Sequence, residues 1–154
     1  MALSRNRLRG YVDANVILSG VATDNPHSAS RVVLVASELT LLDLVANERA
    51  IEECTRNLAR FVKDEGQLRE LEDLLQEVVS RSIEVVETPA AGERSSVPGA
   101  DPKDLVHLLS AVEHGCDYLI TANTKDFPGS YEGTTVLEPG TLVRRIREQI
   151  KGLS

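Results

Sequence analysis

The chain alternates short apolar runs with longer stretches in which apolar residues recur every three or four positions. Short runs rich in Val, Ile and Leu are typical of strands buried in a parallel sheet, and the longer spacing is typical of amphipathic helices. Turn-forming residues separate most of these segments. The pattern predicts strands over 8–12, 39–45, 83–87, 117–121 and 134–137.

Helices are predicted between these strands. Asn47 is expected to cap a helix over 48–61, whose apolar face includes Cys54, Leu58 and Phe61. The helix over 105–113 is expected to end at His114, with Gly115 as its C-cap. The other predicted helical segments are 16–21, the segment after Ser28 or Ser30 up to Glu38, the one after Gly66 up to Val79, and the C-terminal segment after 139–141.

Strands that alternate with helices argue for parallel pairing, because a parallel connection needs a crossover. We therefore expect an α/β fold, a three-layer α/β/α sandwich around a mainly parallel central sheet. At 154 residues the chain fits one domain, spanning 1–154, and is long enough to bury a core.

Composition narrows the classes of function. The net charge of −7 argues against a general nucleic-acid coat protein, which would be basic, but it is compatible with a nuclease whose acids bind metal. No apolar run is long enough for a membrane span, and no secretion signal is recognisable, so a cytoplasmic location is expected. Cys54 and Cys116 lie in apolar segments and are expected to be buried free thiols.

Four acids fall where the predicted fold would bring them to one edge of the sheet. Asp13 ends the first strand, Glu53 lies on the next long helix, Asp104 starts the helix over 105–113, and Asp126 follows the strand over 117–121. Clustered carboxylates repel one another unless a cation compensates, and a few carboxylates with water are what Mg²⁺ prefers. Each acid also has a structural interpretation, such as Asp104 as a helix N-cap.

Three segments carry a resemblance to a known family. They are 12–20, reading VDANVILSG; 47–58, with Glu53 in the acid position; and 101–127, reading DPKDLVHLLSAVEHGCDYLITANTKDF. Together they cover most of the chain's predicted elements, and the chain resembles PIN-domain proteins, the fold of VapC-like toxin ribonucleases.

The resemblance implies a metal-dependent endoribonuclease that hydrolyses RNA phosphodiester bonds, with Asp13, Glu53, Asp104 and Asp126 as catalytic metal ligands. Mg²⁺ is the expected cofactor and Mn²⁺ a substitute. A metal-activated water would attack the scissile phosphate. The resemblance also implies the toxin of a toxin–antitoxin pair, with RNA as substrate, a small antitoxin protein as partner and a homodimer as the working form.

Two departures from the family pattern leave alternatives open. Asn123 stands where many relatives carry an Asp, and Asp126 is expected to supply the missing charge; otherwise the chain is a catalytically inactive PIN-like binding module. The doublet of Glu52 and Glu53 leaves the helix acid ambiguous, and spacing favours Glu53. Thr121 is expected to orient a carboxylate or a bound water, and His107 to serve packing rather than catalysis.

Overall fold

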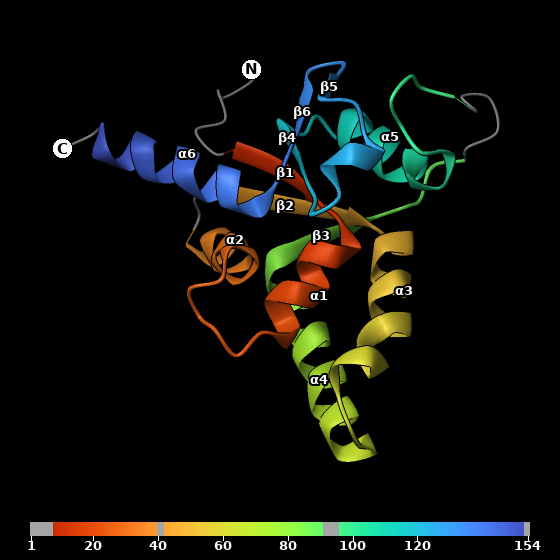
Figure 1. Cartoon of the computed structure of the whole chain (residues 1–154), viewed down its shortest axis with the longest axis vertical. Coiled ribbons are helices and arrows are strands. Elements are labelled where there is room, and N and C mark those ends of the chain that lie inside the picture. Colours follow the sequence, from red (N-terminus) through yellow and green to blue (C-terminus); the bar gives the residue numbers. More distant parts are fainter. Residues whose placement is uncertain (1–7, 40–41, 91–95, 153–154) are drawn as a thin grey trace.

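Six strands form one sheet in the computed structural model, which describes residues 8–39, 42–90 and 96–152. The strand order is β3-β2-β1-β4-β6-β5, and all neighbours pair in parallel except β5, which runs antiparallel to β6. The central strand β1 therefore lies between β2 and β4 (Figure 1). The strands are β1 Leu8–Val12, β2 Leu42–Asn47, β3 Ile83–Val86, β4 Tyr118–Ile120, β5 Ser130–Tyr131 and β6 Thr134–Leu137.

Helices form most of the crossover connections between the parallel strands. The described residues also include three short 3₁₀ segments. Ser28 caps α2 by accepting from the backbone N–H of Arg31, and Asp64 caps α4 in the same way through Gln67. The helices are α1 Ala14–Ala22, α2 Ala29–Glu38, α3 Glu48–Asn57, α4 Glu65–Ser82, α5 Leu105–Glu113 and α6 Pro139–Lys151. The 3₁₀ segments are η1 Leu58–Phe61, η2 Pro102–Asp104 and η3 Thr124–Asp126.

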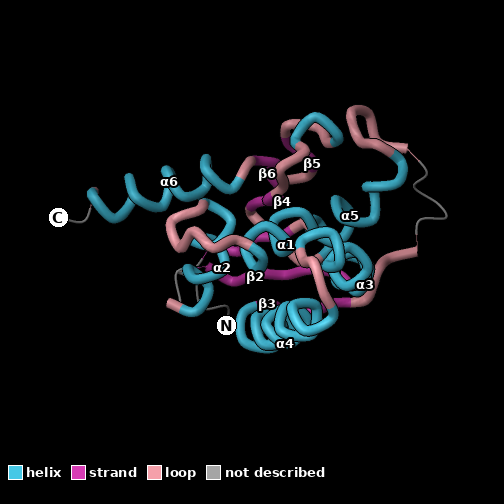
Figure 2. Tube along the Cα trace, turned by 60° about the horizontal axis from the view of Figure 1, so that its bottom comes forward, coloured by secondary structure: helices cyan, strands magenta, loops and turns pink. Residues whose placement is uncertain are grey.

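The helices cover the sheet unequally. Successive strand residues point to opposite faces, so Val12 packs into the core shared by α1, α2, α3 and α4, whereas the adjacent Tyr11 packs into the core shared with α5. Figures 1 and 2 show α5 on one side of the sheet, with α1, α2 and α4 on the other. The expected α/β sandwich with a mainly parallel sheet is confirmed.

Three details differ from the prediction. The strand expected over 39–45 is β2 at 42–47, and Leu39 ends α2 instead; residues 40–41 lie outside the described residues. The short strand β5 was not predicted. Phe61, expected on a buried helix face, is 52% exposed. The two thiols, Cys54 and Cys116, are free and buried as predicted.

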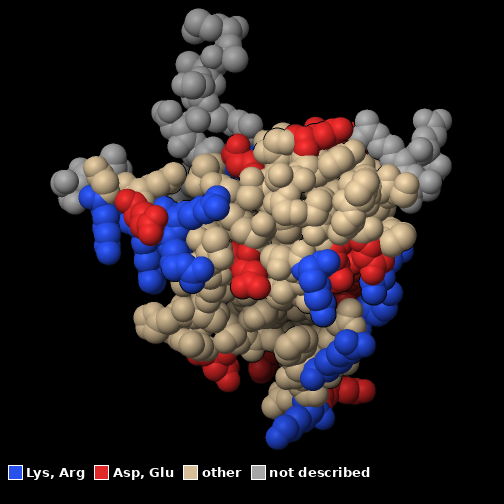
Figure 3. Space-filling model, turned by 45° about the horizontal axis from the view of Figure 1, so that its top comes forward, with Lys and Arg blue, Asp and Glu red and all other residues tan. Residues whose placement is uncertain are grey.

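Charged side chains are unevenly distributed over the surface. Figure 3 shows Lys and Arg atoms gathered over α6, and a second group of them beside Asp and Glu atoms on the opposite side of the same face. Across the described part of the chain, no helix combines the length and apolar character needed to cross a membrane.

Candidate active site

All four predicted acids line one cavity of about 520 Å³. Asp13 follows β1, Glu53 lies in the second turn of α3, Asp104 ends η2, and Asp126 ends η3. The cavity lies where β1 and β4 end, which is the edge of an open α/β sheet where ligands usually bind. Parallel pairing, with Val12 opposite Ile120, brings these chain segments together.

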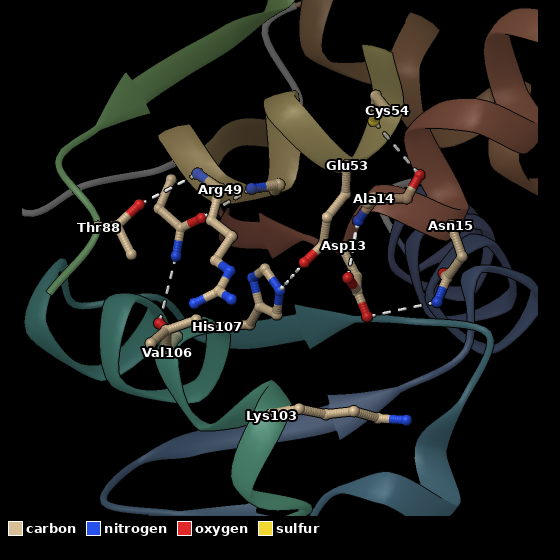
Figure 4. A network of polar contacts seen from close by, with 12 residues as sticks. Asp13, Ala14, Asn15, Arg49, Glu53, Cys54, Thr88, Lys103, Val106 and His107 are labelled. Atoms are coloured by element: carbon tan, nitrogen blue, oxygen red, sulfur yellow. Dashed lines mark hydrogen bonds and ion pairs between the residues drawn. The ribbon is translucent and has the colours of Figure 1, made fainter. Parts of the chain in front are cut away.

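Asp13 is buried and tightly oriented. Its Oδ1 accepts from the backbone N–H of Ala14 at 2.7 Å, which caps α1, and its Oδ2 accepts from the hydroxyl of Thr121 at 2.9 Å. The side-chain amide of Asn15 also donates to Oδ2, at 3.3 Å (Figure 4). The prediction that Thr121 orients a carboxylate is confirmed, and a carboxylate fixed by several donors is preorganised to hold a cation.

Glu53 faces a buried histidine across the cavity floor. His107 is fully buried on α5, and its Nε2 lies 3.5 Å from Oε1 of Glu53 (Figure 4). Its Nδ1 lies 2.7 Å from the hydroxyl of Tyr11. The oxygen of that hydroxyl accepts a hydrogen bond from the backbone N–H of Asn47 at 3.3 Å. His107 is thus packed in the core as predicted, and it also links β1 to the Glu53 carboxylate.

The carboxylates and the imidazole change each other's protonation. The neighbouring His107 lowers the pKa of Glu53. Burial opposes the charging of His107, but the Glu53 and Asp13 carboxylates outweigh it, so its pKa is raised. Burial together with Asp13 raises the pKa of Asp104 to about 6. Both causes disfavour the charged form of the Asp104 carboxyl group.

Asn47 holds α3 against α5. Its Oδ1 accepts from the backbone N–H of Ala50 at 2.9 Å, which is the predicted N-cap. Its Nδ2 donates to the hydroxyl of Ser110 at 3.0 Å and to the carbonyl of Val106 at 3.3 Å. Since Asn47 is fully buried, these bonds fix the position of α3, and hence of Glu53, relative to α5.

The other two acids come from loops that are tied together. The backbone N–H of Asp101 donates to the carbonyl of Asp126 at 2.8 Å, and the N–H of Asp104 donates to the carbonyl of Asp101 at 2.9 Å. The side chain of Asp104 makes no capping bond at the start of α5. Helix capping therefore does not explain why position 104 is an aspartate, and the Asp104 carboxylate remains available to the cavity.

The residues fit a divalent cation. Ligand atoms of Asp13, Glu53 and His107 lie within 4.8 Å of one another, and carboxylate oxygens are the donors that Mg²⁺ and Mn²⁺ take. Asp104 and Asp126 line the same cavity without belonging to this close trio.

The structure also shows where Glu52, Glu53 and Asn123 lie, whose roles the sequence left open. Glu52 is exposed and does not line the cavity, whereas Glu53 does, so the helix acid is Glu53. Asn123 lines the cavity from an exposed position. Sequence reasoning assigned no site role to several other lining residues, among them Asn57 and the exposed residues Arg60, Phe61 and Lys103. No sequence signal marked the three exposed residues, which lie on the short 3₁₀ segments η1 and η2.

Comparison with known proteins agrees with this arrangement. A sequence model described as the PIN domain matches residues 9–125, well over half of the chain. Among solved structures, the chain is similar to the crystal structure of PAE2754 from Pyrobaculum aerophilum. The TM-score is 0.63 at 19% identity, over 92% of this chain and 96% of that one. None of the curated proteins matches the chain significantly.

Proposed function

The chain belongs to the PIN domain family, and from this we propose that it is a metal-dependent endoribonuclease. PIN domains are generally nucleases that use divalent metals, so the family places the chain among the hydrolases of nucleic acid. The observation that carries the finer proposal is the convergence of Asp13, Glu53, Asp104 and Asp126 on one cavity, where carboxylate oxygens of Asp13 and Glu53 lie within 4.8 Å of each other. RNA is the proposed substrate, and Mg²⁺ or Mn²⁺ the proposed cofactor.

The side chains divide the work of holding the ion and the substrate. Asp13 and Asp104 would hold the main ion, Glu53 would complete its surroundings, and Asp126 would support a second, weaker ion. When bound, a divalent cation supplies activated water and neutralises charge on the phosphate. Thr121 keeps the Asp13 carboxylate in place.

The remaining polar groups act around that centre. His107 holds Glu53 in place through the contact of its Nε2 with the carboxylate. Arg60 and Lys103, at the margin of the cavity, attract the phosphates of the strand.

A cleavage assay tests this function. Unstructured and structured RNA are incubated with the purified protein in Mg²⁺, Mn²⁺ or EDTA, and Asp13→Asn serves as the inactive variant. We expect cutting that requires metal and falls at least about 100-fold in Asp13→Asn. Cutting that persists in EDTA or in the variant would contradict the proposal. Absence of both cutting and metal binding would support an inactive binding module instead.

The biological role extends the same proposal. We propose that the chain is the toxin of a toxin–antitoxin pair, is held inactive by a small antitoxin protein, and works as a cytoplasmic homodimer. The support is the likeness of its motifs to toxin ribonucleases. Growth arrest on expression of the wild type, but not of Asp13→Asn, is the expected result. Sedimentation at several protein concentrations tests the dimer, and a constant monomer mass would contradict it.

A further inference from the structure

One wall of the acidic cavity is a continuous stripe along α3 and η1. Glu53 and Asn57 line the cavity from α3, and Arg60 and Phe61 line it from η1. At about 1.5 Å of rise per residue in α3 and about 2.0 Å in η1, the backbone advances roughly 14 Å along the helix axis between Glu53 and Phe61. The cavity therefore extends well beyond the acids.

Phe61, at the far end of the stripe, is unusually exposed. Its ring is 52% exposed, although the chain has only two phenylalanines and the other, Phe127, is 5% exposed. The start of η1 is anchored, since Leu58 is fully buried. The backbone thus presents the Phe61 ring from a fixed base, instead of leaving it on a loose segment.

Positive charge accompanies this ring. Arg60 precedes it in η1, and Lys103 lines the same cavity from η2. An aromatic platform beside cations is how proteins bind unpaired nucleotides, because the cations take the phosphates and the ring stacks on the base. An apolar protein segment would find these cations and the acids unfavourable neighbours.

We propose that the Phe61 end of the cavity is a subsite for an unpaired nucleobase, with Arg60 bound to the adjoining phosphate. The subsite selects single-stranded RNA, and it rests on the proposed nuclease function. A nucleotide flanking the scissile phosphate stacks on the ring while that phosphate lies at the acids.

Tryptophan fluorescence reports on this subsite, because the chain contains no tryptophan of its own. Phe61→Trp is titrated with a single-stranded oligoribonucleotide and with a duplex of equal length, both in the non-cleaving Asp104→Asn background. Leu39→Trp is the matched control, since Leu39 is 62% exposed and lines a different groove, between α2 and α6. We expect quenching of the Phe61→Trp signal by the single strand only, and none of the Leu39→Trp signal.

Alanine and charge variants separate stacking from charge. In the same background, Phe61→Ala is expected to weaken binding of the single strand about 10-fold without changing its salt dependence. Arg60→Gln is expected to reduce the slope of log affinity against log salt by about 1, because it removes one phosphate contact. Equal affinity of Phe61→Ala and the parent for the single strand would overturn the subsite.

The remaining outcomes distinguish the subsite from the nuclease function. If the wild type cuts RNA but the Phe61→Trp signal does not respond to it, the subsite is overturned and the nuclease stands. A signal that changes with protein concentration in the absence of RNA would make Phe61 a protein contact and overturn the subsite as well. If neither cutting nor RNA binding occurs, both proposals fall.

Discussion

Asp104 shows at the scale of one residue how a partly buried acid lowers the stability of the folded protein. Burial and the Asp13 carboxylate raise its pKa to about 6 from an ordinary 3.8. A carboxyl group with a raised pKa binds its proton more tightly in the folded state. Its ionisation therefore lowers the free energy of unfolding as the pH rises from about 4 to 6, and the loss is complete above that range.

Asp104→Asn is accordingly expected to stabilise the metal-free protein at pH 7.5 while abolishing metal-dependent cleavage. A shift of about two pKa units corresponds to roughly 3 kcal/mol when fully buried, and solvent screening of this partly exposed group reduces the expected gain to about 1 kcal/mol. Urea unfolding in EDTA at pH 4 and pH 7.5 measures it. A variant less stable than the wild type at pH 7.5 would show that ionised Asp104 does not destabilise the folded protein, and would contradict the prediction.

His107 makes a prediction about a single proton. The backbone N–H of Asn47 donates to the Tyr11 hydroxyl, and we expect that hydroxyl to donate its own proton to Nδ1 of His107. The neutral ring then carries its proton on Nε2, facing Glu53. The ¹⁵N shifts of the ring in the metal-free protein, recorded above its pKa, are expected to show the Nε2–H form. A proton on Nδ1 would free Nε2 as a metal ligand and contradict the positioning role.

Sequence reasoning reached some of these residues and not others, for physical reasons. The four acids were predictable because Asp13 and Asp126 follow strands, Asp104 starts a helix and Glu53 lies near the start of one, and the parallel sheet dictates where these elements lie. The contact of His107 with Glu53 depends on how α3 passes α5, which no spacing within one segment reveals. Phe61 was wrongly placed on a buried helix face, because apolar spacing does not show that the helical segment ends with η1 at this residue.

At the scale of elements, the packing of α3 on α5 decides whether the acids meet. Asn47 contributes both the cap of α3 and two bonds to α5, and all three are buried. The sequence predicted the cap alone. The α5 bonds explain why the residue is an asparagine, since an aspartate would cap equally well but could not donate.

Asn47→Ala is expected to lower the free energy of unfolding by about 2–4 kcal/mol, since a cap and two buried hydrogen bonds are lost. Thermal unfolding measures the loss, with Ser28→Ala as the control because its hydroxyl caps α2 without reaching another element. The control is expected to cost about 1 kcal/mol. Equal losses in the two variants would show that the α5 bonds contribute nothing.

Element prediction failed where the elements were short. The strand β5 has two residues, Ser130 and Tyr131, followed by Glu132 and Gly133, both with positive φ. Two residues give no periodicity from which a strand can be read, and the antiparallel pairing comes from the turn alone. The longer strands and helices were predictable because apolar spacing repeats several times within each.

For the whole molecule, the net charge of −7 is consistent with a protein that handles a polyanion, because the charges are segregated. The four acids converge on one cavity at the sheet edge, and Lys and Arg atoms lie beside Asp and Glu atoms and over α6 (Figure 3). Composition alone could show the balance of charge but not its placement, which the crossovers of the fold determine. The proposed function depends on whether this cluster of acids binds a divalent cation.

Calorimetric titration of the metal-free protein with Mn²⁺ tests this binding most directly. Glu53→Gln and Glu52→Gln form a matched pair, because they remove one charge each from neighbouring residues of α3 while only Glu53 lines the cavity. We expect the wild type and Glu52→Gln to bind Mn²⁺ alike, and Glu53→Gln to bind at least about 10-fold more weakly. Equal binding by the two variants, or no binding by the wild type, would contradict the metal centre.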